Sequence, residues 1–337
     1  MPLVFPRAWH RPLMVLAASM ALWAAGSAIG LLVDARTLVG APIWSKPLKF
    51  AVSLTGYALS LAWMISLLER ARPRLARPAW WAGTVVAAAS GVEMVLITAQ
   101  AFRGRQSHFN YATPFDARLY EIMAGSIVVL WLGALVIAVL LFRARIADRA
   151  TTWSIRIAAT LALAGAGLGF LMTQPTAAQR AVGDDGAPIV GGHAVGVPDG
   201  GPGMPLTGWS TTGGDLRVPH FVGMHALQLL PLFVLVLAAL AARFAVLNEE
   251  RVRLRLVLVA GAVYGAVLAL LTWQALRGQS LTSPDGTTLG AAGLILAAAA
   301  LGTLLSLRRG GGPGAREGAD PAGPGSVPRS SVRSSAS

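Results

Sequence analysis

The sequence contains no cysteine, and among its 337 residues there are only 15 acidic side chains and five histidines. Without cysteine the chain has no disulfide, no thiolate nucleophile, no cysteine-ligated zinc site and no cysteine-bound iron–sulfur cluster. Histidine, aspartate and glutamate are therefore the only strong metal ligands that it offers. The sequence also lacks an HExxH motif, a GxSxG motif and a paired-carboxylate motif, so no common hydrolase signature is present.

Charge of either sign is scarce as well. Charged residues make up 13% of the chain and hydrophobic residues 55%, and the mean hydropathy of +0.61 lies outside the range of soluble globular proteins. A net charge of +13 would suggest nucleic-acid binding in a soluble protein. Here the basic residues form short clusters between apolar runs, which is typical of membrane topology. The composition predicts an all-α polytopic membrane protein whose partner is the lipid bilayer and not a nucleic acid.

About eight apolar stretches approach the roughly 20 helical residues that are needed to cross a bilayer. The expected transmembrane helices cover residues 12 to 33, 49 to 69, 80 to 102, 121 to 142, 154 to 173, 220 to 242, 254 to 276 and 287 to 307. Arginine clusters precede the first stretch and follow every second one, so the positive-inside rule places both termini in the cytoplasm of a multi-pass cell-membrane protein. The first stretch also resembles a signal peptide, but its apolar run continues to Val33, which favours a retained helix.

Three ordered sequence echoes predict a duplication. "ITAQAFRGRQS" from residue 97 returns as "LLTWQALRGQS" from residue 270, "AGSAIGLLV" at 25 resembles "AGAGLGFLM" at 164, and "PLKF" at 47 resembles "VPHF" at 218. Small residues recur by chance in apolar sequences, but chance explains the shared Gln-Ala-apolar-Arg-Gly pattern poorly. We expect two parallel four-helix repeats, residues 1–150 and 151–310, because four helices return the chain to the same side of the membrane.

Two segments rich in glycine and proline lie outside the expected helices. Residues 174–219 form a long outer loop, interpreted either as a lid or as a flexible connector. Residues 311–337 have the composition of a disordered cytoplasmic tail. The abundance of alanine, arginine and glycine is typical of a GC-rich bacterial genome.

The polar residues of the expected helices concentrate toward the outer side. Glu93 lies inside the third apolar stretch, about 10 Å below Gln100 along the helix axis, and shares a helical face with Ser90 and Gln100. An ionised carboxylate near the centre of a membrane costs at least about 2.5 kcal/mol, so such a residue indicates a functional site with a partner. The partner expected from depth is Lys49, whereas Lys46 is expected to reach the headgroups.

Further candidates follow from helical spacing and from the duplication. His225 and Gln228 share a face of the sixth helix, while His220 points about 140° away from His225. Gln274 and Arg277 are the counterparts of Gln100 and Arg103. The expected substrate or ion-binding residues are thus Glu93, Lys49, Gln100, His225, Gln228, Gln274, Arg103 and Arg277.

Three functions remain open at this stage, and no cofactor is identified. The first is a carrier of a small molecule or of protons, with the site between the repeats. The second is an enzyme at the outer face, with His108, His220 and His225 holding a metal ion if the fold brings them together. An eight-helix duplicated architecture is similar to the heme A synthase type, but the last two expected helices contain no histidine, so the similarity is limited to helix number. The third is a non-catalytic sensor or assembly factor that binds a lipid headgroup or a partner protein.

Overall fold

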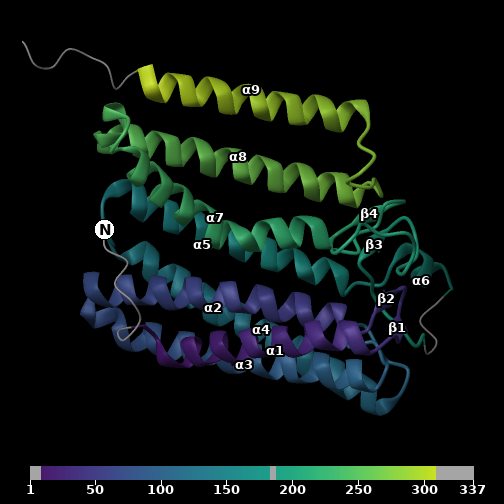
Figure 1. Cartoon of the computed structure of the whole chain (residues 1–337). Helices are drawn as coiled ribbons and strands as arrows, with labels where there is room; N and C mark the ends of the chain where they lie inside the picture. Colours follow the sequence, from purple (N-terminus) through teal and green to yellow (C-terminus); the bar gives the residue numbers. More distant parts are fainter. Residues whose placement is uncertain (1–8, 183–186, 309–337) are drawn as a thin grey trace, which may run out of the picture.

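The fold is a bundle of long helices. A computed structural model describes residues 9–182 and 187–308, and in this part of the chain eight long helices lie side by side (Figure 1). They are α1 (Arg11–Val33), α2 (Ser45–Ala71), α3 (Ala76–Phe102), α4 (Pro114–Arg143), α5 (Arg149–Met172), α7 (Arg217–Leu240), α8 (Glu250–Leu276) and α9 (Gly286–Arg308). All eight are long and apolar enough to cross a membrane, which confirms the prediction of an all-α polytopic membrane protein.

The short elements are unevenly distributed between the two ends of the bundle. One end, called here the loop end, carries α6 (Ala177–Val182) and two small antiparallel pairs, β1 (Thr37–Leu38) with β2 (Ala41–Pro42) and β3 (Ala194–Val195) with β4 (Gly214–Asp215) (Figure 1). The other, called the arginine end, carries the 3₁₀ turns η1 (Pro73–Leu75) and η2 (Ala245–Asn248) and the arginine-rich linkers. The start of α1 and the end of α9 both lie at the arginine end (Figure 1). The tail expected at 311–337 lies outside the described residues.

Several helices begin earlier than the apolar runs suggest, and at α4 and α5 a capping side chain extends the helix into polar sequence. α4 starts at Pro114 and not near residue 121, since the Thr113 side chain accepts a hydrogen bond from the backbone N–H of Asp116. Asp116, expected in a loop, therefore belongs to the first turn of α4. α2 likewise starts at Ser45, so Lys46 is helical and lies one turn before Lys49.

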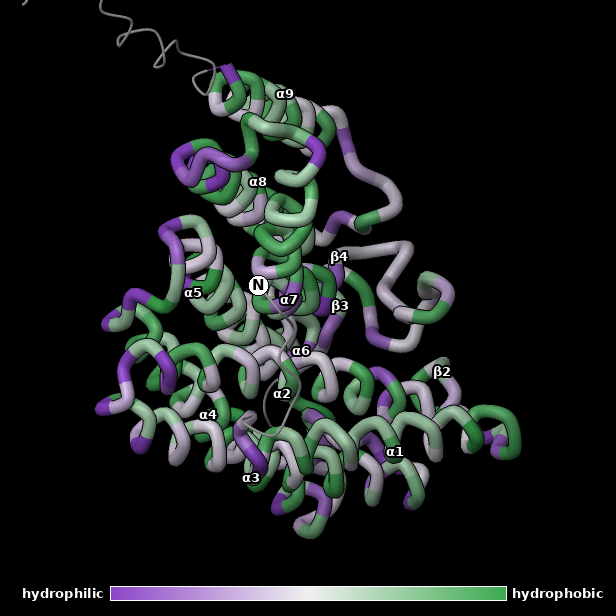
Figure 2. Tube along the Cα trace, turned by 60° about the vertical axis from the view of Figure 1, so that its left-hand side comes forward, coloured by the Kyte–Doolittle hydropathy of each residue, from purple (hydrophilic) through white to green (hydrophobic). Residues whose placement is uncertain are grey.

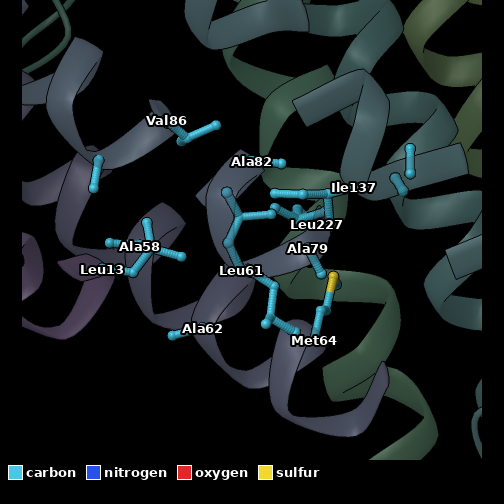
Figure 3. Packing of buried hydrophobic residues seen from close by; sticks show 14 of the residues in the cluster. Leu13, Ala58, Leu61, Ala62, Met64, Ala79, Ala82, Val86, Ile137 and Leu227 are labelled. Carbon is cyan, nitrogen blue, oxygen red and sulfur yellow. The ribbon is translucent and has the colours of Figure 1, made fainter. Parts of the chain in front are cut away.

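The largest core cluster joins the first four helices to α5 and α7. Figure 3 shows its packing, with Leu13 of α1, Met64 of α2 and Ile137 of α4 among its fully buried members and Leu227 contributed by α7. Alanines such as Ala58, Ala62, Ala79 and Ala82 face this core and let the helices approach closely, which is how helices pack in a lipid solvent. The core therefore continues across the boundary between the two predicted halves.

A close backbone approach joins α5 to α7 at two glycines. A Cβ atom built on Gly165 would lie 2.5 Å from Cα of Gly223, and one built on Gly223 would lie 2.4 Å from Cα of Gly165. Only a residue without a side chain fits at either position. Nearby, Nδ1 of His220 lies 2.8 Å from the carbonyl oxygen of Gly165, which ties the two helices together at the same level.

α9 lies at one edge of the bundle and packs on α8 (Figure 1). Two of its residues, Thr288 and Ser306, are buried, and large side chains such as Leu294 are well exposed. Hydrophilic segments gather at the turns between helices, and hydrophobic segments run along the helices (Figure 2). The exposed apolar surface therefore covers the part of the bundle that a bilayer would surround.

Candidate functional site

A buried glutamate from α3 meets a histidine from the linker that follows the same helix. Glu93 is 1% exposed, and its Oε1 atom lies 3.3 Å from Nε2 of His108. Oε2 accepts a hydrogen bond of 3.1 Å from the hydroxyl of Ser126 on α4. Among the described residues, Oε1 has no partner with hydrogen-bond geometry, so His108 approaches this atom closely without an aligned hydrogen bond, and Ser126 is the hydrogen-bond donor to the carboxylate.

Lys46 contacts the opposite side of the same imidazole ring. Its Nζ atom lies 3.1 Å from Nδ1 of His108. An ammonium group has donors and no acceptor, so Nδ1 accepts and the ring proton resides on Nε2, which faces Glu93. The hydroxyl of Ser107 lies at 3.1 Å from the same Nδ1 atom. Lys46, His108 and Glu93 thus form a continuous polar chain, called here the Lys46–His108–Glu93 chain, from the first turn of α2 into α3.

His108 remains neutral in this setting. Burial, together with the nearby Lys46 ammonium, lowers the pKa of His108 to about 4, although the Glu93 carboxylate acts in the opposite direction. The ring packs among the aromatic side chains of Phe50, Phe109 and Tyr120, with centroid distances of 6.0, 6.0 and 6.2 Å. At neutral pH the imidazole therefore acts as donor at one nitrogen and acceptor at the other, which is the arrangement that passes a proton along a chain.

The described part of the long loop before α7, residues 187–216, packs over this chain at the loop end of the bundle. Phe109 contacts His193 of the loop, with ring centroids 5.1 Å apart, and its carbonyl oxygen accepts a hydrogen bond from the backbone N–H of Val190. Asp199 holds His193 through Nδ1 at 2.9 Å and through the backbone N–H groups of His193 and Ala194. Burial lowers the pKa of His193, opposed by Asp199. The loop is therefore a folded cover over His108.

A second polar network lies next to the Glu93 site, where α3 ends and α4 begins. Asp116 is fully buried, and its Oδ1 atom accepts hydrogen bonds from Gln100 Nε2 at 3.0 Å and from Arg103 Nη1 at 2.6 Å. Its Oδ2 atom accepts from the hydroxyl of Thr113 at 2.8 Å. Arg103 also donates to the side-chain oxygen of Gln100. Gln100 and Arg103 are thus held by Asp116 and do not contact Glu93.

The corresponding turn after α8 has closely related contacts. Nε2 of Gln274 donates to the carbonyl oxygen of Ser280 at 2.8 Å, as Nε2 of Gln100 donates to that of Gln106 at 3.2 Å. Arg277 pairs with Asp285 at 2.6 Å near the start of α9, as Arg103 pairs with Asp116 at the start of α4. Gly278 and Gly104, which follow the two arginines, have φ angles of +72° and +64°. The shared sequence pattern therefore forms the same type of turn twice.

The remaining expected site residues lie apart from Glu93 or face other partners. Lys49 is exposed, and its Nζ atom donates to the carbonyl oxygen of Thr207 in the outer loop; Lys46 occupies the place expected for Lys49. His225 stacks on Phe221 with a centroid distance of 3.9 Å, and its Nδ1 atom lies 2.9 Å from that residue's carbonyl oxygen. The Gln228 side chain has a buried oxygen without a hydrogen-bond partner among the described residues.

The expected three-histidine metal site is not formed. His108 is bound to Lys46 and Glu93, His220 faces the carbonyl of Gly165, and His225 faces the carbonyl of Phe221. Among residues 9–182 and 187–308, no three histidine, aspartate or glutamate side chains are grouped so as to hold a metal ion. Helical spacing already separated His220 from His225, and the structure directs each ring to a backbone carbonyl.

Sequence reasoning missed two members of the site, Lys46 and Ser126. Lys46 was assigned to the headgroup region because the apolar run begins near residue 49, yet Pro47 in the first helical turn is a signal that α2 starts earlier. Nothing in the sequence pairs Ser126 with Glu93, since the two meet across α3 and α4. Comparison of the chain with protein-family models, with curated proteins and with solved structures finds no match.

Proposed function

We propose that this protein is a proton-linked carrier of a small solute in the cell membrane, and that Glu93 takes up and releases the proton. The observation that carries the proposal is the contact between the Glu93 carboxylate, which is 1% exposed, and the His108 imidazole. Lys46 contacts the other nitrogen of the same ring. Ionisable groups inside membrane bundles are costly to bury, and they commonly mark proton and ion pathways. The neutral ring of His108 connects Glu93 to Lys46, which lies nearer the loop end.

The duplication belongs to the same proposal. The matching turns at Arg103 and Arg277 support two parallel repeats, residues 1–150 and 151–310. The helix neighbours also match: α1 packs on α2 as α5 packs on α7, and α3 packs on α4 as α8 packs on α9. Parallel repeats frame the substrate site in known carriers. The arginine end, and with it both termini, faces the cytoplasm under the positive-inside rule. In this orientation the loop end faces outward.

The outer loop acts as the gate of the carrier. Lys49 donates to the carbonyl of Thr207, and Arg217 donates to the carbonyl of Gly208, so two cations at the starts of α2 and α7 hold the same loop segment. A solute that approaches His108 from outside must displace the loop around His193. Because the contacts of Lys49 and Arg217 lie at the surface, the loop segment around Thr207 and Gly208 moves without disturbing the helical core.

The other two functions have less support. An enzyme with a metal ion on three protein ligands needs such a ligand set, and the described residues contain no group of three candidate ligands. A sensor that binds lipid headgroups would place its polar groups at the rim of the bundle, whereas Glu93 and Gln100 are buried inside it. The carrier accounts for both the buried carboxylate and the loop that covers it.

The test uses purified protein in liposomes that contain a pH-sensitive dye, with the membrane potential clamped. Small solutes are added in turn, and proton entry is recorded for the wild type, Glu93→Gln and the control Glu121→Gln, an exposed residue paired with Arg118 at the loop end. We expect at least one solute to evoke proton entry in the wild type. The rate of this entry should fall about a hundredfold in Glu93→Gln, as for removal of a proton-transfer group. It should not fall in Glu121→Gln. Wild-type flux in Glu93→Gln, or no solute-dependent flux in the wild type, would overturn the proposal.

A further inference from the structure

An open apolar cleft lies between α4 and α5, away from the Glu93 site. Its volume is about 380 Å³, and its walls include Trp131, Leu135, Val139 and Phe142 from α4 and Leu163 and Gly167 from α5. The indole N–H of Trp131 donates to the carbonyl oxygen of Leu163 at 3.1 Å, so the inner end of the cleft is fixed. Val139 and Phe142 are 41% and 45% exposed, so the cleft opens to the surrounding membrane.

The length of the cleft matches one leaflet of a bilayer. Trp131 and Phe142 are eleven residues apart in α4, which is about 16 Å along the helix axis at 1.5 Å per residue. Half of a hydrocarbon core of about 30 Å is about 15 Å. The cleft therefore runs from near the middle of the bundle to the arginine end, over the depth that one acyl chain occupies.

A cluster of arginines surrounds the end of the cleft near Phe142. The Arg156 guanidinium is fixed there: Nη2 donates to the carbonyl oxygens of Phe142 at 2.9 Å and Ala144 at 3.1 Å, and the group lies 5.5 Å from the Phe142 ring centroid. Arg143 and Arg145 follow Phe142 within three residues of the chain, and both are exposed. The nearby carboxylates of Asp148 and Glu250 are engaged by Thr151 and by the backbone N–H of Arg149.

We propose that this cleft binds one anionic phospholipid, with an acyl chain along α4 and α5 and the phosphate group among Arg143, Arg145 and Arg156. Guanidinium groups bind phosphate through paired hydrogen bonds, and basic pockets between transmembrane helices at the arginine-rich side are typical sites for anionic headgroups. The apolar walls alone would accept any lipid, so the arginines provide the selectivity. The site lies at the junction of the two proposed repeats and does not depend on proton transport.

The headgroup is tested by native mass spectrometry of the delipidated protein with phosphatidylglycerol or phosphatidylcholine of identical acyl chains. We expect the wild type to retain one phosphatidylglycerol and to bind it at least about fivefold more tightly than phosphatidylcholine, which corresponds to one arginine near the membrane surface. Arg145→Gln, which changes an exposed linker residue without hydrogen bonds to described residues, and Arg156→Gln should each weaken that preference about fivefold. Arg308→Gln, at the end of α9, is the matched control and should leave it unchanged.

The acyl-chain position is tested with Gly167→Leu, which fills the cleft. A Cβ at Gly167 would lie 4.0 Å from the Trp131 Nε1 atom, so the backbone tolerates the change. The control is Gly125→Leu on α4, where a Cβ would meet nothing within 4 Å. Gly167→Leu should lower retention of both lipids at least about fivefold relative to Gly125→Leu. Equal retention of the two lipids by the wild type, or equal retention by the two leucine variants, would overturn the proposal.

Discussion

His108 folds back over the helix that precedes it, so that its Nε2 atom lies 3.3 Å from Oε1 of Glu93. The helix α3 ends at Phe102, and the linker that follows it brings the imidazole to the carboxylate. Two residues that are separated by 15 positions thus lie in direct contact. The remaining nitrogen of the ring faces Lys46, so Nδ1 accepts and the ring proton lies on Nε2.

Replacing Lys46 tests whether the lysine belongs to the chain. In Lys46→Gln the His108 ring loses the cation that fixes Nδ1 as an acceptor. We therefore expect solute-dependent proton entry into liposomes to fall about tenfold, which is less than the loss expected when a proton-transfer group itself is removed. Glu121→Gln is the control, because it removes an exposed charge, paired with Arg118, at the same end of the bundle. Glu121→Gln should keep most of the flux. A larger loss in Glu121→Gln than in Lys46→Gln would contradict the assignment.

The depressed pKa of His108 predicts a pH dependence of stability. Burial lowers that pKa to about 4 from 6.5, so below pH 6.5 the unfolded chain binds more protons than the folded chain. The free energy of unfolding should therefore fall as the pH falls from 6.5 to 4, by up to about 3 kcal/mol from this residue. His108→Gln, which does not titrate, should remove part of that slope in thermal unfolding measured across this range. An unchanged slope in His108→Gln would show that other groups cause it.

The sequence was sufficient to place the helices and to predict that Glu93 is buried. Helical spacing puts Ser90, Glu93 and Gln100 on one face, and all three are at most 1% exposed. A membrane solvent makes such predictions dependable, because a polar stripe must turn away from lipid. Helical periodicity also placed His220 and His225 on different faces of their helix, and in the structure these two side chains do not converge on a metal site.

The partners of these residues were harder to predict, because they come from other elements. Periodicity reports which face of a helix is polar, but it does not say which linker folds over that face. His108 was assigned to a metal site with His220, and no spacing in the sequence indicates that it approaches Glu93. Similarly, the partner of His220 is the carbonyl of Gly165, which follows from the close crossing of α5 and α7. Contacts of this kind are set by packing across the bundle.

The two related turns predict unequal effects of removing their carboxylates. Asp116→Ala leaves the buried donors of Gln100 and Arg103 without an acceptor, so we expect a loss of about 3 kcal/mol in the free energy of unfolding, the low end for a broken buried pair, since Arg103 is 39% exposed. Asp285→Ala breaks a pair that is 38% exposed on both sides and removes one helix cap, so its loss should be smaller than that of Asp116→Ala. Thermal unfolding of the two variants in one detergent measures the difference. Equal losses would mean that burial of the Asp116 network adds no stability beyond that of the exposed pair.

The glycines of the two turns should behave alike. Gly104 and Gly278 have φ angles of +64° and +72°, and a Cβ would meet nothing within 4 Å at Gly104 and nothing closer than 3.4 Å at Gly278. Alanine at either position therefore carries the backbone strain alone, about 1 kcal/mol. Gly104→Asn should recover part of the loss, because asparagine tolerates the left-handed conformation. A loss in Gly104→Ala that asparagine does not reduce would point to a steric cause instead.

The crossing of α5 and α7 gives the sharpest contrast between neighbouring glycines. Gly165→Ala would place a Cβ atom 2.5 Å from the Gly223 backbone, so the helices must separate and we expect a loss of about 3 kcal/mol or more. Gly167→Ala, two residues later, meets Trp131 at 4.0 Å, and the gain in helix propensity should raise stability by about 0.5 to 1 kcal/mol. Melting temperatures of the two variants should therefore move in opposite directions from the wild type. The separation also moves the carbonyl that faces His220, so a Gly165→Ala protein that melts like the wild type would contradict the close packing of the second half.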